Sequence, residues 1–205
     1  LLSESAFLSG DLAYALRMHK VMLEDARRRG SLMPTVWGLF GVAANSIRRG
    51  KAAESVPLLE EGLRILEQGP NVASELNTNS QLALAHHHLG NREAALEYAG
   101  RVLTLAEKVS FTVYSLDIGF SSVAQVYFEL WEEALRSPNG TVDPASIKAS
   151  VDRSLKLLRR FAGTFPIGKP YGMFFQGWSD MLTGKQGAAV SAWRRGLDAA
   201  SKYNL

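Results

Sequence analysis

Glycines recur along this chain at a fixed spacing. Gly10, Gly50 and Gly90 stand 40 residues apart, and a small residue follows each of them five positions later. Gly184 opens a fourth copy of the pattern after a gap of 94 residues, which is about two further periods with an insertion. A fixed period of this size is typical of helical hairpins stacked in a row. The spacing therefore predicts an all-α solenoid in which each glycine marks a turn between two helices.

The stretch from Leu82 to Val109 illustrates one such hairpin. Apolar residues at three- and four-residue spacing on both sides of Gly90 predict two amphipathic helices. Gly90 can end the first helix because glycine adopts positive φ without a Cβ penalty, and Asn91 can cap the second. Ala95 leaves room for the two helices to approach closely. Because neither helix buries its apolar face alone, the hairpin needs neighbours of its own kind.

The same signals divide the chain into about five hairpins of a right-handed solenoid. The expected hairpins cover residues 1–29, 33–68, 71–109, 112–162 and 170–203. The turn residues of Ser137–Thr141 predict a loop inside the fourth hairpin, and Asp143 followed by Pro144 predicts the start of its second helix. We expect residues 1–205 to be a single helical-repeat domain taken from a longer protein.

The composition argues against several classes of function. Without cysteine the chain forms neither disulfides nor thiolate sites, which fits a cytoplasmic protein. A net charge of +3 from 23 basic and 20 acidic residues is too balanced to indicate a nucleic-acid partner. No apolar run approaches the roughly 20 residues that cross a bilayer, so no membrane partner is expected either. The acidic residues Asp117, Asp143 and Asp180 are scattered, and the segment is predicted to be non-catalytic, without cofactor or metal.

The spacing of glycine turn, small residue and second helix resembles the tetratricopeptide repeat family. It is carried by Gly90, Ala95 and Val102, and again by Gly184, Ala189 and Gly196. The period near 40 exceeds the family's usual length of about 34 residues, so longer helices are expected. The resemblance implies a scaffold that binds a protein or peptide, or another domain of its own chain.

A narrower resemblance covers the end of the chain. The stretch FPIGKPYGMFFQGW (Phe165–Trp178), followed by TGKQGAAVSAWRRGLDAASKY, is similar to the helical-repeat tail of large multidomain adenylate and guanylate cyclases. In those proteins a cyclase domain and an ATPase module precede the repeats, so the resemblance implies a regulatory segment of a signalling protein. The run from Gly163 to Lys169 begins like a phosphate-binding loop, but Pro170 lacks the hydroxyl and the N–H that such a loop uses, and we expect no nucleotide site.

The first helices of the hairpins are expected to line the concave surface of the array. Phasing from the glycine turns places these side chains there: Trp37, Phe40, Arg48, Asn77, Ser80, Leu84, His87, His88, Tyr171, Phe174 and Trp178. The aromatic stripe at the end of the chain is either core or a groove that grips a peptide through aromatic anchors. A second hypothesis is a site for a small effector, which would need a closed pocket of about 300 Å³ or more.

Three further patterns have ordinary structural explanations. The adjacent residues His86, His87 and His88 point about 100° apart on a helix, so they cannot chelate one ion together, and we expect His86 in the packing seam. Asn139-Gly140-Thr141 matches a glycosylation sequon but is typical of a turn. Basic clusters that offset helix dipoles, or else bind phosphate or an acidic partner, are Arg27–Arg29, Arg48–Lys51, Arg159-Arg160 and Arg194-Arg195.

Overall fold

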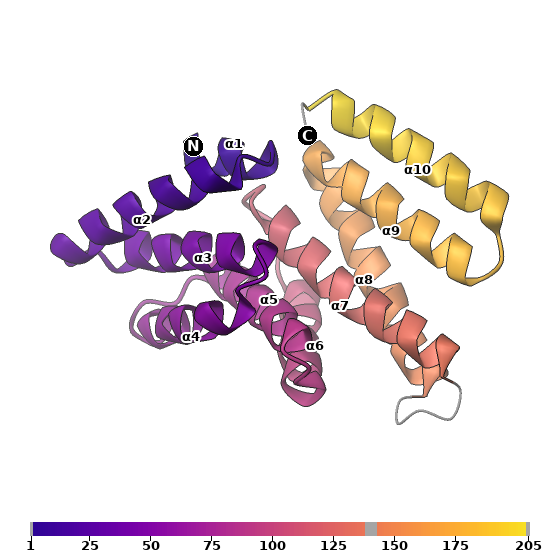
Figure 1. Ribbon diagram of the computed structural model, residues 1–205, viewed down its shortest axis with the longest axis horizontal. Coiled ribbons are helices and arrows are strands. Elements are labelled where there is room, and N and C mark those ends of the chain that lie inside the picture. Colours follow the sequence, from indigo (N-terminus) through magenta and orange to yellow (C-terminus); the bar gives the residue numbers. More distant parts are fainter. Residues whose placement is uncertain (1, 138–142, 204–205) are drawn as a thin grey trace. The chain divides into compact units, whose positions relative to one another are not determined.

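A computed structural model describes residues 2–137 and 143–203 (Figure 1). These residues form helices joined by short turns, and no strand occurs among them, which confirms the all-α prediction. The chain divides into two compact units, residues 1–98 and 99–205, with the boundary inside one helix. The expectation of one continuous domain stays a prediction.

The first unit repeats a helix every 20 residues. It contains α1 (Leu2–Leu8), α2 (Leu12–Arg28), α3 (Leu32–Arg48), α4 (Ala52–Gln68), α5 (Val72–His88) and the start of α6 (Arg92–Lys108). The helices α2 to α6 have 17 residues each, and their first residues are 20 positions apart. Two such helices with their turns account for the 40-residue spacing of the glycines.

Glycine supplies the sharp turn at most of the reversals between helices, although not between α4 and α5, where Gly69 has φ −149°. The backbone has positive φ at Gly10 (85°), Gly30 (64°), Gly50 (76°), Gly90 (75°) and Gly184 (78°). Residues other than glycine rarely adopt this backbone conformation, because their Cβ atom comes too close to the following carbonyl oxygen. The four glycines that the sequence singled out are therefore confirmed as turns. Gly30, which follows α2, belongs to the same set and was missed because it falls midway between two of them.

The small residue five positions after each turn lies where two helices meet. Ala15, Ser55, Ala95 and Ala189 are all fully buried. At Ser55 the hydroxyl also donates a hydrogen bond across the hairpin to the carbonyl oxygen of Ala43, 3.1 Å away. Close approach of the two backbones is thus the reason that a small side chain stands at this position.

Helices of the first unit pack in chain order. Each of α1 to α4 packs against the helix that follows it, and α3 also packs against α5, so the first helices of successive hairpins are neighbours. Leu23 of α2 meets Leu39 and Val42 of α3 in the core, with Leu58 and Ile65 of α4 against them. Such packing between consecutive elements is what a stacked helical array requires.

The second unit has the same order of packing. It contains the end of α6, then α7 (Leu116–Arg136), α8 (Pro144–Thr164), a 3₁₀ turn (Pro166–Gly168), α9 (Lys169–Leu182) and α10 (Gln186–Ser201). The consecutive helices α7 to α10 pack on one another, and α7 also packs against α9. Figure 1 shows α9 and α10 lying side by side as the last hairpin.

One helix begins later than the sequence predicts. The expected helix from residue 112 starts at Leu116, after a turn at Tyr114 and Ser115. Phe111 is buried between Phe120 and Phe161, with ring centroids 5.1 and 5.9 Å away. Burial of this ring fixes the chain ahead of α7, and the β-branched Thr112 gives the helix little reason to extend backwards.

The start of α8 is as predicted. Asp143 is the N-cap, and its carboxylate accepts hydrogen bonds from the backbone N–H groups of Ala145 (3.0 Å) and Ser146 (3.1 Å). Ser137 follows α7, whereas residues 138–142, including the sequon at Asn139, lie outside the described residues. Among the helices described, none combines the length and the apolar character needed to cross a membrane.

Candidate interaction surfaces

An exposed aromatic side chain marks the first helix of the second hairpin. Trp37 of α3 is 52% exposed, although large aromatic residues tend to be covered. Its indole Nε1 donates a hydrogen bond to Oγ of Ser74 in α5, 3.2 Å away. Phe40, one turn further along α3, is half-buried. The hydrogen bond holds the indole beside α5, so this face offers an aromatic surface whose orientation is already set.

Three residues predicted for the groove are instead buried. Asn77, Ser80 and Leu84 of α5 are 7%, 0% and 5% exposed, and the Ser80 hydroxyl donates to the carbonyl oxygen of Leu76 within its own helix, 2.7 Å away. Every residue from Leu76 to Ala85 is buried, polar and apolar alike. Phasing from the turn assumes one covered and one open face, and α5 does not have that division.

The histidines separate as helix geometry requires. His86 is half-buried and stacks on Tyr98 of α6, with ring centroids 5.5 Å apart and planes 7° apart, which places it in the packing seam as expected. His87 is half-buried and His88 is exposed. Within the described ranges no group of three or more His, Cys, Asp or Glu side chains is arranged to hold a metal ion.

Basic residues of the first unit are engaged in local contacts. Arg48 lies over the ring of Phe7, with its guanidinium carbon 4.7 Å from the ring centroid. Arg27 reaches both carboxylate oxygens of Glu61 at 2.8 Å, which joins α2 to α4. Arg28 and Arg29 pair with Asp25 of their own helix. The Arg27–Arg29 cluster therefore has structural partners besides the helix dipole.

Aromatic residues of α9 have mixed roles in the second unit. Trp178 is half-buried, packs 5.3 Å from the ring of Phe128 in α7, and donates from Nε1 to Oε2 of Glu132 at 3.1 Å. Phe174 packs edge-on against Trp178 at 5.9 Å, yet it is 49% exposed. Tyr171 is half-buried. Trp178 is thus partly core while Phe174 is at the surface, and a groove that grips a peptide through this stripe stays a prediction.

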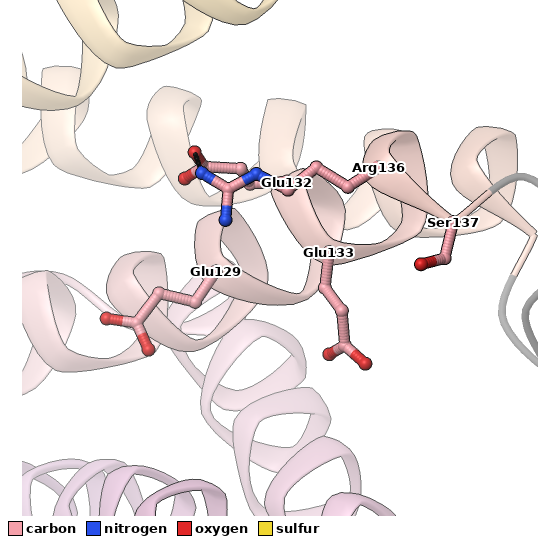
Figure 2. A pocket seen from close by; sticks show the side chains of 5 residues that line it. All are labelled: Glu129, Glu132, Glu133, Arg136 and Ser137. Atoms are coloured by element: carbon pink, nitrogen blue, oxygen red, sulfur yellow. Dashed lines mark hydrogen bonds and ion pairs between the residues drawn. The ribbon is translucent and has the colours of Figure 1, made fainter.

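A shallow hollow lies on α7 (Figure 2), and one of the residues that line it, Glu132, is the acceptor for Trp178. Its volume is about 260 Å³, and its lining comes from the last turns of α7: Glu129, Glu132, Glu133, Arg136 and Ser137. Glu132 pairs with Arg136, and Figure 2 shows Glu129 and Glu133 projecting away from that pair. This hollow was not among the predicted sites, although carboxylates at three- and four-residue spacing could have indicated an acidic face on α7.

Two buried titratable groups lie in the cores of the units. Burial lowers the pKa of His19 below its ordinary value, although the backbone carbonyl of Ala15 opposes this. In the second unit, burial raises the pKa of the Tyr127 hydroxyl. Both shifts follow from the cost of charging a group away from water.

The run that begins like a phosphate-binding loop is a helical corner. Gly163 and Thr164 form the end of α8, a 3₁₀ turn follows, and α9 begins at Lys169. A Cβ atom on Gly168 would lie 2.5 Å from the ring of Phe161, so this glycine allows close packing between the corner and α8. Gly168 thus has a packing role here, whereas a Cβ atom on Gly163 would meet nothing within 4 Å.

Comparisons of this chain with protein-family models, with curated proteins and with solved structures find no match. The resemblances to the tetratricopeptide repeat and to the repeat tail of nucleotide cyclases therefore stay predictions.

Proposed function

We propose that the chain is a protein-interaction scaffold, a right-handed, tetratricopeptide-like array whose first helices bind a protein or peptide or another domain of the same chain. The observation that carries the proposal is the exposure of Trp37 on α3 and of Phe174 on α9, each about half exposed. In this proposal the segment is non-catalytic and regulatory. It belongs to a larger cytoplasmic signalling protein, such as a nucleotide cyclase with an ATPase module.

The physical support is that these side chains are held in place before a partner arrives. Ser74 orients the indole of Trp37, and Glu132 orients that of Trp178, against which Phe174 packs. Aromatic side chains provide much of the energy of protein interfaces, and holding them rigid reduces the entropy lost on binding.

The alternative is a repeat domain that senses a small effector. One observation favours it: α5 buries a row of polar side chains, and the acceptor oxygens of Thr78 and Asn79 have no hydrogen-bond partner. Against it, the hollow on α7 is below the roughly 300 Å³ typical of ligand pockets and is lined from one helix alone. We therefore favour a protein partner.

The proposal can be tested by capturing partners from an extract of the source cells. Immobilised wild-type protein is compared with Trp37→Ala, with Trp37→Ala plus Phe40→Ala, and with Phe174→Ala, and the bound proteins are quantified by mass spectrometry. Leu197→Ala is the matched control, because Leu197 is 69% exposed but lies on a second helix, α10. We expect the aromatic variants, shown to be folded by circular dichroism, to lose specific partners that the control retains. Equal capture by all folded variants would contradict the proposal.

A further inference from the structure

The outer face of α8 carries a row of exposed cations. Arg153, Lys156, Arg159 and Arg160 are all exposed. Lys156 follows Arg153 by three residues, and Arg159 and Arg160 follow Lys156 by three and four, so the side chains lie on one side of the helix. At 1.5 Å of rise per residue, the row extends for about 10 Å along the helix axis. This face belongs to α8, the second helix of its hairpin, and one of its residues, Arg159, also contacts Gln176 of α9.

The end of α6 lies against this row. Arg160 donates from Nη1 to the carbonyl oxygen of Ala106 at 2.9 Å and from Nη2 to that of Val109, and Arg153 donates from Nε to Oε1 of Glu107 at 2.9 Å. Lys108 follows Glu107 in the chain, is exposed, and its charge acts on the Glu107 carboxyl together with the charges of Arg153 and Lys156. We call the set Lys108, Arg153, Lys156, Arg159 and Arg160 the α8 cationic face.

The pKa of Glu107 shows that the cations of this face stabilise a negative charge. Its side chain is solvent-exposed, and yet the pKa of its carboxyl lies below the usual value. The main cause is the hydrogen bond from Arg153, and the positive charges of Arg153, Lys156 and Lys108 add to it. A carboxylate placed at this surface is thus stabilised even where water competes, because several cations act on it together.

We propose that the α8 cationic face binds an acidic segment of a protein partner, and that Glu107 occupies part of the same surface when the partner is absent. A guanidinium group pairs well with a carboxylate because its N–H groups can match both oxygens. Arg153 already binds one carboxylate on this face, through Nε to Oε1 of Glu107. Glu107 then competes with the partner's carboxylates. This site is separate from the aromatic surfaces on the first helices and goes beyond the interaction proposed for them.

The surroundings favour a protein over the other polyanions. Phe161 lies within the same stretch of α8 but is fully buried, so the row offers no exposed ring on which nucleic-acid bases could stack. The row also lacks an exposed large apolar side chain that could insert into a lipid surface. Two carboxylates place negative charge at the edges of the row: Asp152, which pairs with Lys148 on the same helix, and Glu107. They repel a uniform polyanion, and so favour a partner whose carboxylates are spaced to match the cations of the row.

The test uses a fluorescent helical peptide with glutamate at three- and four-residue spacing, and a matched peptide with glutamine at those positions. We expect the glutamate peptide to bind the wild-type protein at least about tenfold more tightly at low salt, and salt to weaken this binding. Lys156→Gln plus Arg159→Gln should weaken binding of the glutamate peptide by about tenfold. Glu107→Gln should tighten it by about threefold, because the competing carboxylate is removed.

The matched control is Lys185→Gln plus Arg194→Gln, which removes the same charge from exposed positions at and beyond the turn before α10. This control should leave the affinity within about twofold of wild type. Equal affinity for the two peptides, or equal weakening by the control, would overturn the proposal. So would weaker or unchanged binding by folded Glu107→Gln protein. Tighter binding to phosphatidylserine vesicles or to single-stranded DNA than to the glutamate peptide would assign the face to another class of partner and reject the one proposed.

Discussion

The hydroxyl of Ser55 donates a hydrogen bond to the carbonyl oxygen of Ala43, 3.1 Å away on the neighbouring helix. Ser55 is fully buried between α3 and α4, five residues after the turn at Gly50. At the equivalent positions Ala15, Ala95 and Ala189 are also fully buried. A small side chain at this place is thus a shared requirement of the hairpins, and in one of them it also satisfies a polar contact.

A large residue at this place should separate the helices. We expect Ser55→Leu to lower the free energy of unfolding by about 1–3 kcal/mol through overpacking. Ser55→Ala should cost only about 1 kcal/mol, the value of the lost hydrogen bond. Urea denaturation measures both, with Ala53→Leu as control because Ala53 is exposed on the same helix. A Ser55→Leu variant as stable as wild type would show that the close approach is not required.

His19 and Gly41 form a second close contact between helices. A Cβ atom on Gly41 would lie 2.1 Å from Cδ2 of the buried His19 ring. We expect Gly41→Ala to cost about 1–3 kcal/mol of stability, because the ring has to move within a packed interface. Gly172→Ala is the control, since its Cβ would meet nothing within 4 Å. That change should stabilise α9 by up to about 1 kcal/mol. In thermal unfolding, the melting temperature should therefore fall for Gly41→Ala and rise for Gly172→Ala.

The same histidine should make the fold sensitive to acid. Burial lowers the pKa of His19 below its ordinary value of 6.5, and Nδ1 lies 3.2 Å from the amide nitrogen of Asn45, which donates to a neutral ring. The unfolded chain therefore takes up the proton first as the pH falls, so the contribution of His19 is complete above pH 6.5 and is lost below it. In the His19→Gln variant the free energy of unfolding should fall less as the pH is lowered.

Urea midpoints at about pH 7.5 and pH 5.5 measure the effect, and the comparison with His19→Gln removes the contribution of the other histidines. Wild type should lose more stability between these two values than the variant does. Equal losses would mean that His19 is as easily protonated in the folded protein as in the unfolded chain.

Arg160 should contribute more to stability than its neighbour Arg159. Its guanidinium binds carbonyl oxygens at the end of α6 and lies 4.3 Å from the ring centroid of Phe111. We expect Arg160→Ala to cost about 1–3 kcal/mol, because the carbonyl groups lose their donor and the ring loses its cover. Arg159→Ala, whose partner is Gln176 at the surface, should change stability by less than about 0.5 kcal/mol. Similar losses for both, by urea denaturation, would argue against an anchoring role.

The sequence predicts those features that depend on local signals. Glycine followed by a small residue at a fixed interval identified the turns and the points of close approach, as Gly50 and Ser55 illustrate. Asp143 before Pro144 identified the start of α8. Each of these features depends on backbone conformation or capping within a few residues, so the neighbouring residues in the sequence are enough to reveal it.

Features that depend on distant residues were not predictable in the same way. The place of Phe111 between Phe120 and Phe161 decides where α7 begins, and no local pattern announces that cluster. The burial of Asn77 likewise depends on how α5 is covered, whereas helical phasing gives only the angle at which a side chain leaves the helix. The acidic hollow and the α8 cationic face also arise from several turns acting together, so the fold was easier to infer than its surfaces.

The most direct test of this architecture is a nuclear Overhauser measurement on the two indole groups that bridge first helices. Stacked hairpins predict a cross-peak from the Hε1 proton of Trp37 to the β protons of Ser74, and one from Hε1 of Trp178 to the γ protons of Glu132. Trp37→Phe and Trp178→Phe assign the two signals. Cross-peaks at both sites would confirm that α3 lies beside α5 and α7 beside α9. If a folded sample instead shows Trp37 contacting α4 but not α5, first helices do not stack on one another and the scaffold proposed here is wrong.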